Sequence, residues 1–297
     1  MRPPSWGEAL AGFRYLRGVS RAVRRGVMFP EAGRRAAAPA PGGTTSSRIR
    51  RLRLNERWDF QTTVHRVPVV GLTEPIRILH LSDVHLRGPE PWVDTLCGLL
   101  RASERVPDLI ALTGDIVTRG WAVEVAHQLL DALPPARLGT WAVIGNWEVW
   151  GGAPKDPWGA LLAEHDIRLL VDESVDLGPL TLIGTDDALS GSPDIEAAYR
   201  GVHPDKPALV LTHSPGIFPQ LARGPARVVL AGHTHAGQVR IPGLGPFFLP
   251  RGSGAYPHGW YPHGDAWLFV HRGVGWSVAP WRWRAPPEIA WIDMVPS

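Results

Sequence analysis

The segment IRILHLSDVHL, residues 76–86, joins an apolar run to a short polar motif. Residues 76–82 are almost continuously apolar, which is typical of a strand buried on both faces of its sheet. The run stops at Asp83-Val84-His85, which places a carboxylate and an imidazole one residue apart. An Asp after a strand is usually a turn former, so this motif indicates a functional site only if the same pattern recurs elsewhere in the chain.

The same pattern recurs four times along the chain. Each time, a short apolar run ends at a residue whose side chain can bind a metal ion. The runs and their polar ends are DLIALTG (108–114) before Asp115, TWAVIGN (140–146) with Asn146, ALVLTHS (208–214) with His213, and RVVLAGH (227–233) with His233 and His235. Because α/β proteins place their sites at the exits of buried strands, five such endings in chain order indicate one shared site.

The remaining periodicity predicts an α/β fold. Further strands are expected over residues 180–186, 266–272 and 288–294, and helices over residues 91–105, 120–132, 156–164 and 194–200. Continuously apolar strands that alternate with helical segments are typical of a sheet layered with helices.

Composition is that of an ordinary globular protein. The chain has 297 residues, of which 44% are hydrophobic and 20% charged, so it can bury a sizeable core. The single cysteine, Cys97, excludes an internal disulfide framework and fits a reducing compartment. No stretch approaches the roughly 20 apolar residues of a membrane-spanning helix, and the N-terminus lacks the apolar segment of a secretory signal. The sequence predicts a cytoplasmic protein.

Positive charge is concentrated at the N-terminus. Residues 1–60 hold 13 Arg and four acidic residues, a balance of +9, whereas the whole chain carries only +3. Residues 6–29 have helical period, with an apolar side and an Arg side. We therefore expect a basic amphipathic segment (residues 1–31), a flexible linker rich in Ala, Pro, Gly and Ser (32–54), and one catalytic domain (55–297).

Three interpretations of the basic segment remain open. It packs on the domain as a solvated helix, or it lies on an anionic membrane surface and makes the protein peripheral on the inner face of the membrane. Binding to nucleic acid is the least favoured, because the segment has no base-reading motif.

The residues at the strand ends suit a pair of divalent cations. Carboxylate, imidazole and amide groups together fit Mn, Fe, Zn or Co. A carboxylate can bridge two ions, and the central Asp115 would hold them roughly 3.5–4 Å apart, the separation of two-metal hydrolytic sites.

The motifs DVH, GD, GN, TH and GHTH, in this order, resemble the calcineurin-like metallophosphoesterase superfamily, over roughly residues 60–297. HLSDVHL, LTGDIV, GHTHAGQVRIPGLG and HRGVGWSVAPWRWRAPPEI are similar to a bacterial branch. That branch contains membrane-associated phosphodiesterases and the UDP-diacylglucosamine diphosphatases of lipid A synthesis.

The resemblance implies a site and a reaction. The first metal would be bound by Asp83, His85, Asp115 and His235, and the second by Asp115, Asn146, His213 and His233. The implied fold is a four-layer sandwich of two mixed β-sheets flanked by helices. A metal-bridging hydroxide would attack phosphorus in line, and His235 would help to stabilise the developing charge. The implied substrate is a phosphodiester or diphosphate, lipid-linked and at a membrane surface.

Trp147 departs from the pattern of the superfamily, in which a His follows the Asn and protonates the leaving oxygen. Either Trp147 only packs a loop, or the leaving group needs no protonation, or another residue such as His263 supplies the proton. His258 and His263, in the near-repeat YPHGWYPHGD (256–265), are interpreted as part of a loop at the rim of the site and not as a third metal site. The Trp residues near the motifs, Trp147, Trp150, Trp158, Trp260 and Trp276, are expected to form an apolar rim or core.

Two further functions remain as alternatives. A metal-binding scaffold without turnover is motivated by Trp147, and a nuclease or cyclic-nucleotide phosphodiesterase by the basic segment. Failure to hydrolyse bis-p-nitrophenyl phosphate with any divalent metal would favour the scaffold. Salt-sensitive binding of nucleic acid would favour the nuclease.

Overall fold

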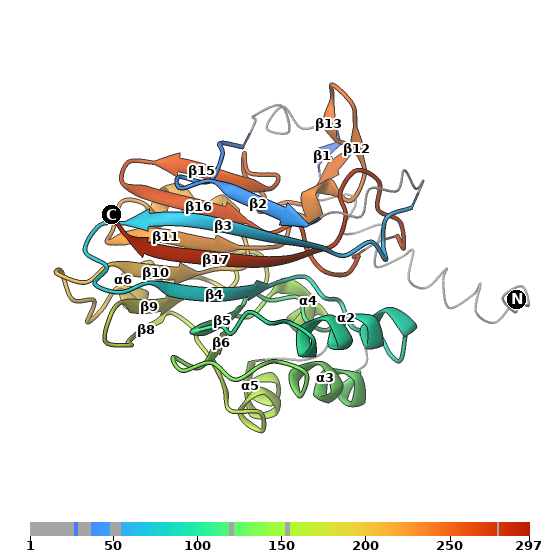
Figure 1. Ribbon diagram of the computed structural model, residues 1–297, viewed down its shortest axis with the longest axis horizontal. Coiled ribbons are helices and arrows are strands. Elements are labelled where there is room, and N and C mark those ends of the chain that lie inside the picture. Colours follow the sequence, from blue (N-terminus) through green and yellow to red (C-terminus); the bar gives the residue numbers. More distant parts are fainter. Residues whose placement is uncertain (1–26, 29–36, 48–54, 119–121, 152–154, 278) are drawn as a thin grey trace, which may run out of the picture.

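The structure is a computed structural model, and it describes residues 27–28, 37–47, 55–118, 122–151, 155–277 and 279–297. Two mixed β-sheets face each other, and helices cover their outer faces (Figure 1). The larger sheet has the order β2 (Thr44–Ser47), β3 (Gln61–Val69), β17 (Glu288–Pro296), β4 (Ile76–Leu81), β5 (Leu109–Leu112), β6 (Thr140–Ala142) and β7 (Ile167–Leu169). The smaller sheet has the order β15 (Gly259–His263), β16 (Ala266–Val270), β11 (Ala226–Ala231), β10 (Ala208–Leu211), β9 (Thr181–Gly184) and β8 (Glu173–Asp176).

Short elements complete the architecture. Two small antiparallel pairs join β1 (Val27–Met28) to β14 (Phe248–Leu249), and β12 (Arg240–Ile241) to β13 (Gly245–Pro246). The helices are α2 (Pro91–Arg101), α3 (Val123–Leu130), α4 (Asn146–Trp150), α5 (Lys155–Ala163), α6 (Ile195–Ala198) and α7 (Phe218–Leu221), with 3₁₀ turns at Pro215–Ile217 and His235–Gly237.

Parallel pairing gathers the strand ends. In the larger sheet β4, β5, β6 and β7 are parallel, and in the smaller sheet β9, β10, β11 and β16 are parallel. The carboxyl ends of parallel strands meet at one edge of a sheet, so the polar residues after β4, β5 and β6 gather at an edge of the larger sheet and those after β10 and β11 at an edge of the smaller sheet. Because the two sheets face each other, the two sets come together.

Three apolar layers hold the sheets and helices together. In β10, Leu209 and Leu211 pack between the two sheets, whereas Val210 packs on the outer layer with Phe218 of α7. In β5, Ile110 faces the helical layer that contains α2, α3 and α5. Both faces of each central strand are therefore buried, which explains why these strands are apolar without a break. The arrangement confirms the expected four-layer sandwich of two mixed sheets.

The eight strands expected from apolar runs are all present, and so are the four expected helices. Three of these helices are shorter than expected, and α5 has the expected length but begins one residue earlier. Strand β3, in the segment QTTVHRVPV, is not predicted from the sequence, because two of its alternating buried positions hold the polar residues Thr63 and His65 and no continuous apolar run marks it. Residues 259–263 form strand β15 against β16, so the interpretation of the whole 256–265 segment as a loop is wrong there.

The N-terminal part of the chain lies mostly outside the described residues, including nearly all of the expected basic segment. Within the range 32–54, residues 44–47 form β2 on the edge of the larger sheet, and Ala40 is buried in the layer between the sheets. The domain boundary at residue 55 stays a prediction. Among the described residues, none of the helices has the length and apolar character needed to cross a bilayer.

Candidate metal centre

Seven buried polar side chains that follow five strands lie close together at the carboxyl ends of the two sheets. Asp83, His85 and His235 form one group of three whose ligand-type atoms all lie within 4.8 Å of one another, and Asp115, His213 and His233 form a second such group. Asn146, the seventh residue, lies beside the second group and is 1% exposed. The structure therefore brings together every residue that the sequence assigned to the two metals.

The first group is linked by short contacts. Nε2 of His235 lies 3.3 Å from Oδ1 of Asp83 and 2.8 Å from Nε2 of His85. The two imidazole rings stack with centroids 4.8 Å apart. Nε2 of each imidazole and a carboxylate oxygen converge on one point, an arrangement suited to binding a cation.

The second group has the same convergence. Nε2 of His213 lies 3.1 Å from Oδ2 of Asp115, 3.2 Å from Oδ1 of Asn146 and 3.2 Å from Nδ1 of His233. The same Oδ2 of Asp115 lies 3.7 Å from Nε2 of His85 in the first group. Asp115 thus stands between the two groups, the position that a bridging carboxylate needs.

Backbone strain is concentrated at these residues. Five of the ten described non-glycine residues with positive φ belong to the site, namely Asp83, His85, Asp115, His233 and His235. Each such conformation costs on the order of 1–3 kcal/mol and persists only where the surroundings fix it. Here the backbone N–H of His233 donates to both carboxylate oxygens of Asp83, at 3.0 and 2.9 Å.

Two glycines permit this crowding. A side chain at Gly145 would overlap the carboxylate of Asp115, and one at Gly232 would overlap Ser82 and Asp83. The Gly in the GN and GH motifs is therefore required by close approach of the backbone to a ligand.

Burial controls the charges of the site. Burial, followed by repulsion from Asp115, raises the pKa of Asp83 to about 7. Burial likewise lowers the pKa of His85 to about 3 and that of His233 to about 4, which keeps both imidazoles neutral. Two close buried carboxylates and neutral imidazoles are the electrostatic condition that divalent cations relieve. The donor set therefore fits a dimetal centre.

Hydrogen bonds from surrounding groups orient the imidazoles. Nδ1 of His213 donates to the carbonyl of Thr113 (2.7 Å), and Nε2 of His233 donates to the carbonyl of Arg251 (2.6 Å). Nδ1 of His85 lies 2.7 Å from Oγ1 of Thr118. In each ring the other nitrogen stays free to face the site, which is the usual arrangement of metal-binding histidines.

The sequence did not assign a role to Arg282, which lies directly behind His235. This guanidinium is fully buried and donates to the carbonyls of Gly275, Arg272 and Ala285. Its Nη2 also lies 3.1 Å from Nδ1 of His235. Since Arg can only donate, it fixes the ring of His235 through that nitrogen. A buried Arg has no local sequence signal, because its partners are carbonyls from distant loops.

The sequence also missed Glu148, which organises the loop before the bridging position. Its carboxylate is fully buried and accepts hydrogen bonds from the backbone N–H groups of Asp115, Ile116, Val117 and Gly145. Burial and the nearby Asp115 raise its pKa to about 7, while the four donors favour the charged form. The signal that marks it is a Glu at the third position of a helix that begins at Asn146.

Trp147 has two roles. Its backbone N–H donates to Oδ1 of Asp115 at 2.8 Å. Its indole meets His85 and Trp150 edge to face, with both centroid distances 5.9 Å, and lines the cavity over the site. The interpretation that Trp147 only packs a loop is therefore incomplete.

A cavity of about 780 Å³ opens above the polar side chains. Asp115, Asn146, His233 and His235 form its floor, and most of its wall is apolar. We call the four aromatic residues Trp147, Trp150, Phe247 and Trp281, all of which line the cavity, the apolar wall. Trp158 and Trp260, which were candidates for such a rim, are instead core residues of α5 and β15.

His258 and His263 do not join the centre. His258 lies against Arg240, at 3.2 Å, and His263 is exposed at the end of β15 that pairs with Ala266, where β16 begins. Strand β16 runs toward the centre, and His263 lies beside its first residue, at the end that points away from the centre. His263 is therefore not a proton donor to the site. Within the described parts of the chain, the two groups above are the candidate metal clusters.

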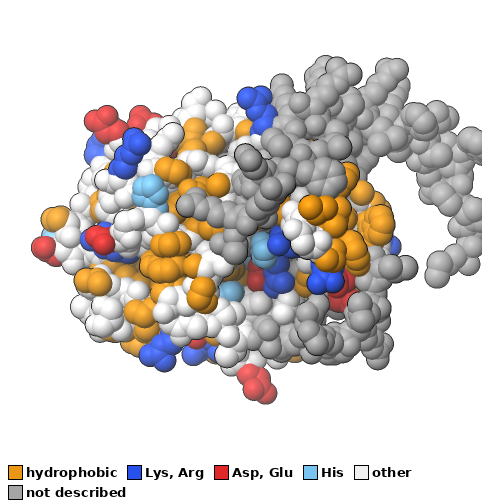
Figure 2. All heavy atoms as spheres, turned by 90° about the horizontal axis from the view of Figure 1, so that it is seen from above, with side chains coloured by type: hydrophobic (Ala, Val, Ile, Leu, Met, Phe, Trp, Pro, Cys, Tyr) orange, Lys and Arg blue, Asp and Glu red, His pale blue; other side chains and the backbone are white. Residues whose placement is uncertain are grey.

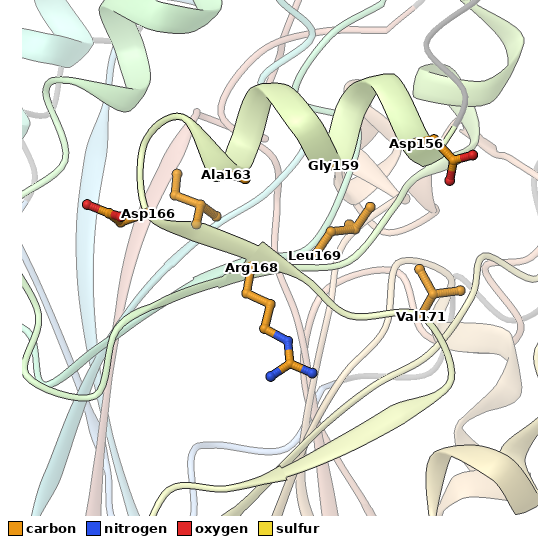
Figure 3. Close-up of a pocket in the computed structure, with 8 residues that line it drawn as sticks. Asp156, Gly159, Ala163, Asp166, Arg168, Leu169 and Val171 are labelled. Carbon is orange, nitrogen blue, oxygen red and sulfur yellow. The ribbon is translucent and has the colours of Figure 1, made fainter.

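A second cavity, of about 710 Å³, lies between α5 and β7, and Figure 3 shows its lining. Its charged residues are Asp156, Asp166 and Arg168, and Arg168 is paired with Glu173 at 2.7 Å. It has none of the converging imidazoles and carboxylates that distinguish the first cavity.

Comparison with known proteins agrees with this geometry. A family model described as calcineurin-like phosphoesterase matches residues 76–237, which include all seven polar residues. An uncharacterized metallophosphoesterase of Helicobacter pylori is 30% identical over 237 residues, covering 76% of this chain and 61% of the relative, so the chain spans about three fifths of that protein.

Two relatives carry names that state an activity. The phosphodiesterase YaeI of Escherichia coli is 29% identical over 228 residues, which cover 74% of this chain and 83% of YaeI. The UDP-2,3-diacylglucosamine pyrophosphatase LpxG of Chlamydia muridarum is 25% identical over 277 residues, which cover 72% of this chain and 82% of LpxG.

Proposed function

This chain belongs to the calcineurin-like phosphoesterase family and is a metal-dependent phosphohydrolase, and we propose that it cleaves a phosphodiester or diphosphate bond in a lipid-linked substrate. The two cations would be Mn, Fe, Zn or Co, bound by Asp83, His85, His235 and Asp115 on one side and by Asp115, Asn146, His213 and His233 on the other. When bound, they supply Lewis-acid stabilisation of phosphoryl oxygens and lower the pKa of water.

The protein's own residues would position the reaction. The backbone N–H of Asp115 donates to Glu148, and the backbone N–H of Trp147 donates to Oδ1 of Asp115, so both the loop and the carboxylate of Asp115 are fixed relative to the two groups. His235 is fixed by Arg282 and lines the cavity floor, where it can interact with a phosphoryl oxygen. Arg251, exposed on the cavity lining, adds positive charge for an anionic substrate.

The observation that carries the substrate class is the apolar wall. Trp147, Trp150, Phe247 and Trp281 line the cavity that contains the polar floor. A small polar diester would leave this wall in water, whereas a substrate with an acyl chain would bury it. Burial of apolar surface contributes about 25 cal/mol per Å². The name of LpxG, a pyrophosphatase of a diacylated sugar nucleotide, supports the same class.

The absence of a histidine at position 147 is compatible with a diphosphate substrate. General acid catalysis matters mainly when the departing oxygen is basic. A nucleoside monophosphate that leaves from a diphosphate is a stable anion, so the indole of Trp147 can serve as part of the wall without loss of a needed proton donor.

The test compares matched substrates. Purified protein, loaded in turn with Mn, Fe, Zn or Co, is assayed on a UDP-sugar with and without two acyl chains, and on bis-p-nitrophenyl phosphate. We expect kcat/KM for the acylated diphosphate to exceed that for the bare one by at least about tenfold, the effect of burying one large apolar group. Equal values would refute the lipid-linked class, and no turnover with any metal would favour a scaffold.

A matched pair of variants locates the effect. Trp281→Ser removes one side of the wall, whereas Trp58→Ser removes a Trp of similar exposure outside the cavity. The first should reduce the preference for the acylated substrate and the second should not.

A further inference from the structure

Large apolar side chains are exposed at eight positions among the described residues, and three of these positions line one cavity. Of eight such residues, Trp150, Phe247 and Trp281 line the mouth of the catalytic cavity, and Leu244 lies on the hairpin that joins β12 to β13. These four are between 39% and 49% exposed. A cluster of this kind marks an interaction site, whereas single exposed apolar residues need no explanation. We call the four residues the apolar rim.

The apolar rim is held together by hydrogen bonds and does not depend on a partner to form. Gln238 donates to the carbonyls of Ala279 and Trp281 and accepts from the backbone N–H of Ser277. The N–H of Phe247 donates to the carbonyl of Val239 at 2.8 Å. The hairpin and the loop that carries Trp281 are thereby one unit, so little conformational entropy is lost when the rim is buried.

Residue types in the apolar rim favour a lipid interface. Two of the four are Trp, which is enriched at the boundary between water and hydrocarbon because its ring is apolar and its N–H is polar. Figure 2, which views the molecule from the top of Figure 1, shows hydrophobic side chains in the middle of this face and toward its right-hand end, where Lys or Arg and Asp or Glu side chains lie beside them. Asp115, on the floor, is the one acidic residue among the described residues that line the cavity.

The basic N-terminus enters the domain at the same place. Strand β1 pairs with β14, with Val27 opposite Leu249 and Met28 opposite Phe248, which itself lines the cavity and follows Phe247 of the rim. The 26 residues that precede β1 hold six Arg and one acidic residue, Glu8. A segment with a balance of +5 is therefore attached beside the apolar rim, and each basic group near an anionic bilayer is worth about 1 kcal/mol.

We propose that the apolar rim docks on the surface of an anionic phospholipid bilayer, so that the mouth of the catalytic cavity faces the membrane. The rim enters the headgroup region, and the positive charge of the sequence that precedes β1 favours anionic lipid over neutral lipid. An acyl chain can then pass from the bilayer to the apolar wall without crossing water. Docking does not require turnover. It rests on the proposed function only in that the same bilayer would hold the lipid-linked substrate.

The orientation can be measured with one label at a time. Cys97 is buried and burial raises the pKa of its thiol, so the natural chain reacts slowly with maleimides and serves as the blank. An environment-sensitive fluorophore is attached to Leu244→Cys in the rim. Val70→Cys and Val106→Cys are the controls, because Val70 and Val106 are 70% and 64% exposed and lie near the starts of β4 and β5, at the opposite edge of the sheet.

Vesicles of phosphatidylcholine with about one third phosphatidylglycerol should shift the emission of the label at position 244 to the blue and leave both controls unchanged. Pure phosphatidylcholine vesicles should give a weaker shift, because the Arg residues then lack a partner. Leu244→Ser should weaken sedimentation with the mixed vesicles by roughly tenfold, and Val106→Ser should not.

Other outcomes overturn the proposal. If the protein binds vesicles but the emission of the label at position 244 does not shift, the N-terminus alone binds the membrane and the rim does not face it. Absence of vesicle binding would reject the membrane as partner. A dimer in sedimentation equilibrium that Leu244→Ser dissociates would assign the rim to a second copy of the chain. Hydrolysis of bis-p-nitrophenyl phosphate is measured in parallel: if docking fails while turnover persists, only the docking is wrong.

Discussion

The metal centre and the apolar wall share one cavity but are built in opposite ways. The seven polar residues of the centre are nearly fully buried and five of them adopt strained backbone conformations, each fixed by hydrogen bonds. The wall consists of partly exposed aromatic side chains: Trp147 and Trp150 lie on α4, Phe247 directly precedes β14, and Trp281 directly precedes Arg282. A rigid centre can serve any phosphoester, whereas an apolar wall selects among them. Changes in the centre should therefore affect all substrates alike, and changes in the wall should affect their ranking.

The largest effect is expected for Asp115→Asn. The amide cannot bridge two cations, so turnover of every substrate should fall by roughly a thousandfold or more, since metal stabilisation is worth several kcal/mol. Initial rates at saturating metal, with circular dichroism to check the fold, provide the measurement. Asp156→Asn, at an exposed position in the other cavity, is the matched control. Near-normal turnover of Asp115→Asn would disprove a dinuclear centre.

A smaller and equally substrate-independent effect is expected for Glu148→Gln. Gln has one acceptor oxygen for four backbone N–H groups, so two of them would face an amide NH₂. The loop that carries Asp115 should loosen, and metal affinity should fall by about 10–100-fold, as it does when the groups behind metal ligands are removed. Calorimetric titration with Mn on this variant and on exposed Glu164→Gln gives the comparison. Unchanged affinity would show that Glu148 only stabilises the helix.

Acid should lower the free energy of unfolding through buried histidines in and near the metal centre, whereas the residues of the apolar wall do not titrate. Burial lowers the pKa of seven histidines: His65, His80, His85, His233, His235, His258 and His271. Below the ordinary histidine pKa of 6.5 the unfolded chain binds protons that the folded chain does not, so the free energy of unfolding falls as pH falls from 6.5 toward about 4. The raised pKa values of Asp83, Glu148 and His213 oppose this loss of stability, but these are three groups against seven.

Urea unfolding of metal-free protein in EDTA at pH 7, 6 and 5 measures this dependence. Each unit of pKa difference corresponds to about 1.4 kcal/mol, so the loss should be clear by pH 5. Stability that rises on acidification would mean that the carboxyl groups, and not the histidines, dominate the centre.

The smallest effect is expected at Trp147, which belongs to both regions. Its backbone holds Asp115 and its indole lines the wall, so Trp147→His preserves the first contact and changes only the second. The imidazole should help poor leaving groups more than good ones, by up to about 10²-fold. Rates for a series of substituted phenyl phosphodiesters should therefore depend less steeply on leaving-group pKa in the variant. Parallel slopes for the two proteins would place position 147 outside the proton path.

Local sequence determined the strands and the chemistry of their ends. The apolar runs before Asp83, Asp115, Asn146, His213 and His233 are continuous because these strands are buried on both faces, and the polar residue after each run is visible without any structure. The five endings are up to 150 residues apart. Parallel pairing aligns the endings within each sheet, and the packing of the two sheets brings the two sets together. Because each polar residue follows its apolar run directly, the seven polar residues could be named from the sequence.

Tertiary structure decided everything that depends on residues without a periodic or motif context. Two of the alternating buried positions of strand β3 hold the polar residues Thr63 and His65, and Arg282 acts through carbonyls of distant loops, so no apolar pattern or motif identifies either. The helix-capping position of Glu148 is visible in the sequence, but its hydrogen bonds to the loop of Asp115 are not. The apolar wall combines residues 147, 150, 247 and 281, and the rim adds Leu244. In the sequence these are ordinary aromatic and aliphatic residues, and many of the 14 Trp are core residues instead. Which ones face the cavity follows from how two sheets and their loops pack, because burial is a property of the fold and not of the residue type.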